Sequence, residues 1–210
     1  MDIVDPRIDA YMRARLARFD EPILLEMETE AARRGFPIVE RNVGVTLEVL
    51  ARAVGARRVV ELGSGFGYSG YWFARAVGPM GELHLTDGDP ENERKARDYL
   101  RRAGLVEPMR FHIGDAVSTL GALEGEFDVV YNDIDKEGYP DAWRAACERV
   151  RVGGLYVCEN VLWSGRVVGE EPDEDTPAIL EHNKMIADDE RYVSTIVPTR
   201  DGVMVAVRVA

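Results

Sequence analysis

The chain has 210 residues, of which 46% are hydrophobic and 30% charged, a composition typical of a globular domain and unlike that of disordered proteins. Its 26 basic and 38 acidic residues give a formal net charge of −12, which disfavours nucleic acid and anionic membrane surfaces as partners because both are negatively charged. The longest apolar runs fall far short of the roughly 20 residues of a membrane span.

The cysteines and histidines form no metal-binding pattern. Cys147 and Cys158 lack metal-type spacing, and the acidic first residues lack the basic and apolar regions of a secretory signal. We therefore interpret both cysteines as reduced thiols in a cytoplasmic protein. His84, His112 and His182 show no helical or strand pairing in the sequence, which disfavours a histidine metal site.

The first 55 residues form a predicted helical region that precedes an α/β core. Apolar residues spaced three to four apart predict helices at Arg7–Phe19, Glu21–Arg34 and Asn42–Val54. From residue 56 onward, short apolar runs alternate with amphipathic segments. The first five runs predict strands at Arg58–Leu62, Glu82–Thr86, Met109–Ile113, Phe127–Tyr131 and Leu155–Cys158. The segments between and after them predict helices at Tyr68–Val77, Glu91–Ala103, Ala116–Leu123, Tyr139–Val150 and Thr176–Asp188.

The order of these elements predicts the fold class. Alternating strands and helices indicate parallel βαβ units with right-handed crossovers. Two further strands, Tyr192–Pro198 and Val203–Val209, are joined by a segment with an Asp-Gly turn signal. The prediction is a single domain with a Rossmann-like seven-stranded α/β sheet, mostly parallel, with a C-terminal antiparallel hairpin and helices on both faces.

A glycine-rich loop follows the first predicted strand. Gly63, Gly65 and Gly67 lead into a helix, and ligands of open α/β sheets bind at the carboxyl ends of the strands. Tyr68 stands where the dinucleotide fingerprint requires its third glycine, which disfavours pyrophosphate and a dehydrogenase. The spacing favours a nucleoside with an amino-acid tail, such as S-adenosylmethionine, although a tight turn without a ligand remains the alternative.

Acidic residues end the second and third predicted strands. Asp87 is placed to accept hydrogen bonds from ribose hydroxyls, and Asp115 to reach an adenine edge. Either residue could instead cap the helix that follows it.

Polar residues also end the fourth and fifth predicted strands. If these strands are parallel neighbours, Asp133, Glu159 and Asn160 come together as three oxygen donors, a set suited to a hard divalent cation such as Mg²⁺. Asp135 is expected to alternate away from Asp133. The alternative is that these residues are solvated caps and turns.

Three segments resemble one enzyme family. Val59–Gly70, Phe127–Tyr139 and Val152–Val167 are similar to the metal-dependent small-molecule O-methyltransferases, the family of catechol and caffeoyl-CoA O-methyltransferases and many bacterial relatives. The resemblance extends from about Val39 to the C-terminus. Its most specific motif is Glu159–Val167, whereas most methyltransferases of this fold share the glycine loop.

The resemblance implies a cofactor, a metal and site residues. It implies that S-adenosylmethionine is lined by Val39, Glu61, Gly63, Gly65, Ser69, Asp87, Asp115, Ala116 and Asp133. It also implies that Asp133, Glu159 and Asn160 bind the cation, that Lys136 is the base, and that the protein is a homodimer. The family usually has Asp-Asn where this chain has Glu159-Asn160, so we expect a shifted metal, a larger ion such as Ca²⁺ or Mn²⁺, or a weaker site.

The sequence therefore predicts an S-adenosylmethionine-dependent O-methyltransferase acting on a hydroxyl of a catechol-like or caffeoyl-type aromatic small molecule. A phenol loses its proton near pH 10, so a cation that favours the phenolate and Lys136 as proton acceptor would both assist the transfer. Trp163, Tyr139 and Trp143 could wall a planar substrate or simply pack in the core. The alternatives are a metal-independent methyltransferase of the same fold and a nucleoside-binding protein with a vestigial site.

Overall fold

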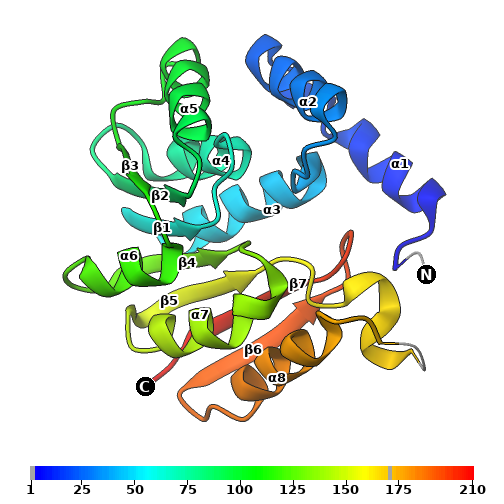
Figure 1. Cartoon of the computed structure of the whole chain (residues 1–210). Helices are drawn as coiled ribbons and strands as arrows, with labels where there is room; N and C mark the ends of the chain where they lie inside the picture. The colour runs from blue at the N-terminus through cyan, green and yellow to red at the C-terminus, as the bar shows by residue number, and fades with distance from the viewer. Residues whose placement is uncertain (1–2, 170–171) are drawn as a thin grey trace.

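A computed structural model of the chain describes residues 3–169 and 172–210. These residues form a seven-stranded sheet with the order β3-β2-β1-β4-β5-β7-β6, shown in Figure 1. The strands are β1 (Arg58–Leu62), β2 (Glu82–Asp87), β3 (Met109–Ile113), β4 (Phe127–Asn132), β5 (Val150–Cys158), β6 (Tyr192–Val197) and β7 (Val203–Arg208). The pairs from β3 to β5 are parallel, and β7 runs antiparallel to both β5 and β6. The predicted fold class is confirmed.

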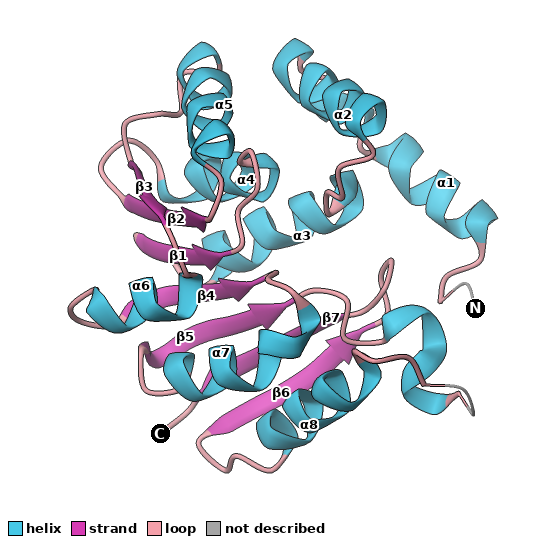
Figure 2. Ribbon diagram, in the orientation of Figure 1, coloured by secondary structure: helices cyan, strands magenta, loops and turns pink. Residues whose placement is uncertain are grey.

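Helices cover both faces of the sheet (Figure 2). One layer contains α2 (Pro22–Arg34), α3 (Glu40–Ala53), α4 (Tyr68–Val77) and α5 (Pro90–Arg102), and the other contains α6 (Ala116–Ala122), α7 (Tyr139–Ala146) and α8 (Thr176–Ala187). The neighbours Val59 and Val60 are both fully buried, one in each layer, because successive strand residues point to opposite faces. The sequence accordingly shows short continuous apolar runs.

The N-terminal helices are attached to the core by a partly buried ionic cluster. Arg41 on α3 is 7% exposed and pairs with Asp20 and Glu28. Glu28 on α2 also accepts a hydrogen bond of 2.8 Å from the hydroxyl of Tyr68, the first residue of α4. A buried charge is tolerated when it is paired and hydrogen-bonded, so this cluster holds α2 and α3 against the helix that follows the glycine loop. The first helix, α1 (Pro6–Arg15), has no buried residue.

Two of the predicted helices end early. The first predicted helix ends at Arg15 and is followed by a 3₁₀ turn at Ala17–Phe19. Helix α7 ends at Ala146 rather than at Val150, and Val150 begins β5. The predicted strand begins at Leu155, whereas β5 begins at Val150. The additional residues accompany a shift in the register of β4 and β5 between Phe127 and Val129, as at a β-bulge.

The expectation that no two histidines pair is wrong for His84 and His112. His84 and His112 stack across β2 and β3, with 3.0 Å between His84 Nδ1 and His112 Nε2. The register pairs His84 with Arg110, and Thr86 with His112, so the two histidines are diagonal neighbours on one face of the sheet. Within the described ranges, no helix is both long and apolar enough to cross a bilayer.

Candidate active site

A cavity of about 990 Å³ lies at the carboxyl ends of the parallel strands. Its walls come from the glycine loop after β1, the ends of β2 to β5, and the segment between α2 and α3. Ten of the residues predicted for the site line this cavity: Val39, Gly63, Gly65, Ser69, Asp87, Asp115, Ala116, Asp133, Lys136 and Asn160. The other two, Glu61 and Glu159, are fully buried at the ends of their strands and do not line it. Asp135, which we expected to alternate away, also lines it.

The glycine loop packs directly against the end of β4. Gly63 has φ +82°, and a Cβ atom there would lie 2.4 Å from the backbone oxygen of Asp133. Only glycine permits both this backbone conformation and this approach. The backbone N–H of Gly65 donates to Asp87 Oδ2 at 3.0 Å. The loop is therefore fixed to β4 on one side and to the end of β2 on the other.

The two acidic residues after β2 and β3 differ in their local roles. Asp87 accepts hydrogen bonds from the Asp89 backbone at 2.8 Å and from Asn92 Nδ2 at 3.1 Å, while Asp89 caps α5. A carboxylate has about four acceptor positions, so Asp87 retains capacity for a ligand hydroxyl. Asp115 caps α6 by accepting from the Ser118 backbone N–H at 2.7 Å, and it lines the cavity as well.

Glu61 is a buried acid behind the glycine loop. Ser69 Oγ donates to its Oε1, and its Oε2 has no hydrogen-bond partner in the described part of the chain. Burial is the main cause that raises the pKa of Glu61 to about 8, and the charge of Asp133 adds to this increase. Glu61 is therefore protonated at neutral pH in the free protein, and a nearby cationic amine would favour its ionisation.

Two acidic residues and one amide follow β4 and β5 directly: Asp133 comes after β4, and Glu159 and Asn160 come after β5. The backbone N–H of Glu159 donates to the oxygen of Asn132 at 3.3 Å, which brings the residues that follow these strands side by side. Burial raises the pKa of Asp133 to about 6. Burial, and then the charge of Asp133, raise the pKa of Glu159 well above its ordinary range. Asn160 has φ +58°, a left-handed conformation that Asn tolerates.

These three residues fit a hard divalent cation. Glu159 is fully buried, and neither of its carboxylate oxygens has a hydrogen-bond partner among residues 3–169 and 172–210. A buried carboxylate without a partner is costly, and a cation bound there would compensate it. The described part of the chain contains no cluster of three His, Cys, Asp or Glu side chains that could hold a metal. The amide oxygen of Asn160 would therefore have to be the third protein ligand.

Lys136 lies beside this set. Its Nζ is 3.5 Å from Asp133 Oδ1 and 3.2 Å from the backbone oxygen of Ile134. It also lies 5.0 Å from the centroid of the Tyr139 ring, and the hydroxyl of Tyr139 donates to the backbone oxygen of Glu159 at 2.9 Å. Lys136 also lines the cavity, so its amine is accessible to a ligand there.

Of the three aromatic candidates, one lies on the cavity wall and two lie in the protein core. Trp163 lines the cavity, and its Nε1 donates to Asp173 at 2.8 Å. Tyr139 and Trp143 are buried, and Trp143 packs edge-on against Tyr156 with ring centroids 4.9 Å apart. Only Trp163 of the three is therefore placed to contact a planar substrate.

Sequence reasoning missed two parts of the wall. Phe36, Pro37 and Ile38, between α2 and α3, line the cavity, and no motif indicated them. Arg200 lines it from the turn between β6 and β7. The signal for Arg200 was present, because a hairpin turn after a strand that ends at the carboxyl edge must lie at that edge.

Comparison with known proteins gives a consistent result. The pattern of the O-methyltransferase family matches residues 15–209. The catechol O-methyltransferase of Mycobacterium tuberculosis is 31% identical over 196 residues, covering 92% of this chain and 89% of that protein. The catechol O-methyltransferase of Niastella koreensis is 33% identical over 178 residues, covering 82% and 79%.

Solved structures agree with this result. One is the O-methyltransferase TomG from Streptomyces achromogenes, which is involved in tomaymycin synthesis and was solved in complex with SAM. It superposes with a TM-score of 0.84 at 27% identity, covering 91% of each chain. The O-methyltransferase from Bacillus cereus in complex with SAH superposes with a TM-score of 0.82 at 25% identity, covering 90% of this chain and 91% of that one.

Proposed function

The chain belongs to the O-methyltransferase family, and from that premise we propose that this S-adenosylmethionine-dependent enzyme methylates a hydroxyl of a catechol-like or caffeoyl-type aromatic molecule with the help of a divalent cation. The observation that supports the cation is the buried Glu159 carboxylate, which lacks a hydrogen-bond partner within the described residues and lies beside Asp133. Two relatives named catechol O-methyltransferase support the acceptor class.

Asp133, Glu159 and Asn160 would hold the cation, with Mg²⁺ as the first candidate and Mn²⁺ or Ca²⁺ as larger alternatives. When bound, the cation would favour the ionised form of an acceptor hydroxyl and fix its orientation. Glu159 directly follows β5 and is completely buried, so its longer side chain would have to reach the cation from inside the protein.

The cofactor supplies a methyl group on a sulfonium, and the chain positions it. We propose that Asp87 accepts hydrogen bonds from the ribose hydroxyls and that Asp115 and Ala116 border the adenine. Glu61, Ser69, Gly63, Gly65 and Val39 would surround the methionine part. The buried Glu61 would ionise against the cofactor amine, because an adjacent positive charge favours the carboxylate.

Lys136, as the neutral amine, would take the proton of the acceptor hydroxyl as the oxygen bonds to the methyl carbon and the carbon–sulfur bond breaks. Its Nζ is held beside Asp133 by the contacts already described. Trp163 would pack against the acceptor ring, because it is the cavity-lining aromatic residue nearest Lys136, 6.0 Å from its Nζ.

A turnover assay tests the proposal. The protein is incubated with S-adenosylmethionine and caffeate or catechol, with Mg²⁺ or with excess chelator, and products are identified by mass spectrometry. We expect methylation that is lost on chelation, and a roughly hundred-fold slower turnover in Lys136→Ala, whereas the exposed control Lys184→Ala is unaffected. Methylation that survives chelation would contradict the cation, and cofactor binding without any product would indicate a vestigial site.

We also propose that the enzyme is a cytoplasmic homodimer with no nucleic-acid or membrane partner. Exposed Val193 and Val197 on the edge strand β6 support self-association, and the free thiols Cys147 and Cys158 support a reducing compartment. Light scattering after size-exclusion chromatography should give twice the chain mass of 23.5 kDa. A monomer mass would contradict the dimer.

A further inference from the structure

We propose that Arg200 is a specificity-determining residue that binds an anionic group, a carboxylate, on the methyl acceptor. The inference rests on the proposed function, because it assumes that the acceptor occupies the cavity beside Asp133 and Asn160. It deepens that function by selecting anionic catechols over neutral ones.

The turn that carries Arg200 is fixed on both sides of this residue. Gly202 N–H donates to the oxygen of Thr199 at 2.9 Å, and the Leu162 N–H donates to the oxygen of Asp201 at 2.9 Å. A Cβ atom on Gly202 would lie 2.4 Å from Leu162 Cγ. The turn therefore packs closely against the segment that follows Glu159 and Asn160.

Arg200 itself adopts a costly backbone conformation. Its φ is +48°, in the left-handed region that residues with a Cβ atom seldom occupy. Residues held in such conformations are concentrated at functional sites, where the surrounding structure maintains them. Here the fixed neighbours in the turn hold Arg200 at the cavity wall.

The guanidinium of Arg200 retains N–H donors that could bind a ligand. Its ion pair is with Glu40 Oε1 at 3.8 Å, beyond hydrogen-bond distance, and Glu40 also pairs with Arg13 at 3.3 Å. Across the described residues, Arg200 makes no side-chain hydrogen bond, and its side chain is 35% exposed. An arginine carries five N–H donors in a planar fork suited to a carboxylate.

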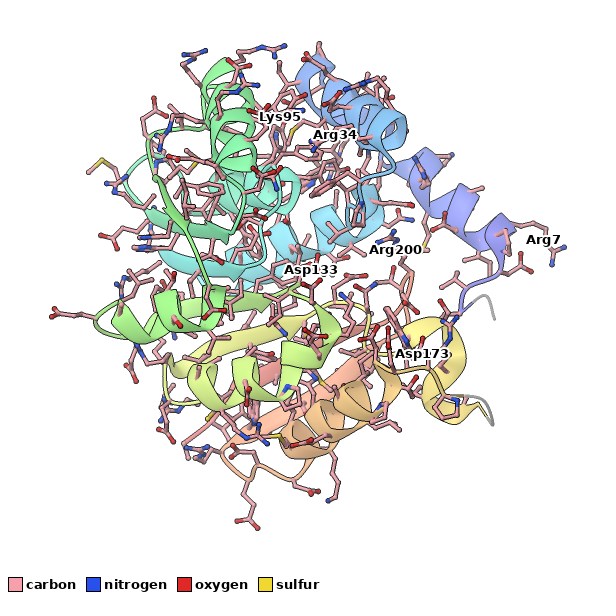
Figure 3. All side chains as sticks on the ribbon, in the orientation of Figure 1. Arg7, Arg34, Lys95, Asp133, Asp173 and Arg200 are labelled. Atoms are coloured by element: carbon pink, nitrogen blue, oxygen red, sulfur yellow. The ribbon has the colours of Figure 1, made fainter. Side chains whose placement is uncertain are left out.

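The charges around the cavity favour an anion at this point. Arg200 lines the same cavity as Asp133 and Asn160, and its positive charge acts to lower the pKa of Asp133 and of Glu159. Figure 3 labels Asp133 and Arg200 near the carboxyl ends of the strands. Lys136 is already paired with Asp133, and the remaining charged residues of the wall are acidic: Asp87, Asp115, Asp133, Asp135, Glu137, Glu174 and Asp175. Apart from the proposed cation, Arg200 is therefore the positively charged group on the described wall that no acidic side chain contacts within hydrogen-bond distance.

The sheet topology separates Arg200 from the residues proposed to hold the ribose and the adenine. The glycine loop, Asp87 and Asp115 follow β1, β2 and β3, on one half of the sheet, whereas the turn of Arg200 joins β6 and β7 beyond β5. The cofactor also has a carboxylate, and Val39, which we assign to its methionine part, precedes the Glu40 that pairs with Arg200. The test below therefore measures cofactor affinity as well as acceptor preference.

The test compares two acceptors that differ in one charge, caffeate and methyl caffeate. Binding of each to the protein saturated with S-adenosylhomocysteine and Mg²⁺ is measured by calorimetry, and kcat/KM is measured with S-adenosylmethionine. The variant is Arg200→Gly, because glycine accepts the positive φ and keeps the turn. Arg200→Lys retains the charge without the fork. Arg97→Gln on α5, an exposed arginine paired with Glu93, is the control for net charge.

We expect Arg200→Gly to lower the preference for caffeate over methyl caffeate about ten-fold, in affinity and in kcat/KM. Arg200→Lys should restore part of the preference, and Arg97→Gln should leave it unchanged. An unaltered preference in Arg200→Gly would overturn the inference, as would a loss confined to cofactor affinity. Arg200-dependent binding of caffeate without methylation would contradict the proposed function and support the inference, whereas methylation of both acceptors with equal efficiency in all variants would do the reverse.

Discussion

Glu61 couples the electrostatics of the site to the stability of the protein. Its pKa in the folded free protein is about 8, whereas an exposed Glu ionises near pH 4.3. As the pH rises between these values, the unfolded chain releases this proton and the folded chain keeps it. Folding stability therefore declines across this range through Glu61, and the loss is complete above pH 8.

The variant Glu61→Gln removes this titration. We expect it to be more stable than the parent chain by about 3 kcal/mol at pH 8 and by little at pH 5, as measured by urea denaturation at both values. We also expect weaker cofactor binding, because a neutral amide cannot pair with the amine. A stability difference that is the same at both pH values would contradict the buried-acid assignment.

At the scale of elements, the turn between β6 and β7 and the segment after β5 form one unit. Gly202 has φ +86° and leaves no room for a methyl group against Leu162. Gly202→Ala therefore combines a backbone cost with a steric one, and we expect it to lower the free energy of unfolding by about 2 kcal/mol more than a matched control.

The matched control for this substitution is Gly104→Ala. Gly104 also has a positive φ, +70°, but a Cβ atom there would meet nothing within 4 Å. It carries the backbone cost alone. Equal destabilisation of the two variants in urea would show that the turn does not depend on the contact with Leu162.

Across the whole molecule, the sequence predicted the elements that follow a local pattern. The strand runs and the glycine loop identified the sheet and its carboxyl edge, and because β4 and β5 are parallel neighbours, the meeting of Asp133 and Glu159 was predictable from chain order. Site residues that directly follow a strand could therefore be predicted from the sequence.

Features set by register or by distant packing could not be predicted in this way. The pairing of His84 with His112 depends on the offset between β2 and β3, which the composition of each strand does not encode. Phe36 and Ile38 pack against a hydrophobic cluster whose members are distant in sequence. The Phe36 ring, for example, lies 5.1 Å from the ring of Phe66 in the glycine loop. Within the acidic run Glu170–Asp175, Glu174 and Asp175 line the cavity, while Glu170 and Glu171 lie outside the described residues.

Titration with Mn²⁺, followed by electron paramagnetic resonance, tests most directly whether Asp133, Glu159 and Asn160 hold a divalent cation. This measurement reports binding without requiring the correct acceptor. We predict one bound Mn²⁺ per chain in the parent protein, displaced by excess Mg²⁺, and loss of that ion in Glu159→Gln, with Glu181→Gln on the exposed surface of α8 as the control. Equal binding by the parent chain and Glu159→Gln, or no binding by either, would contradict the account.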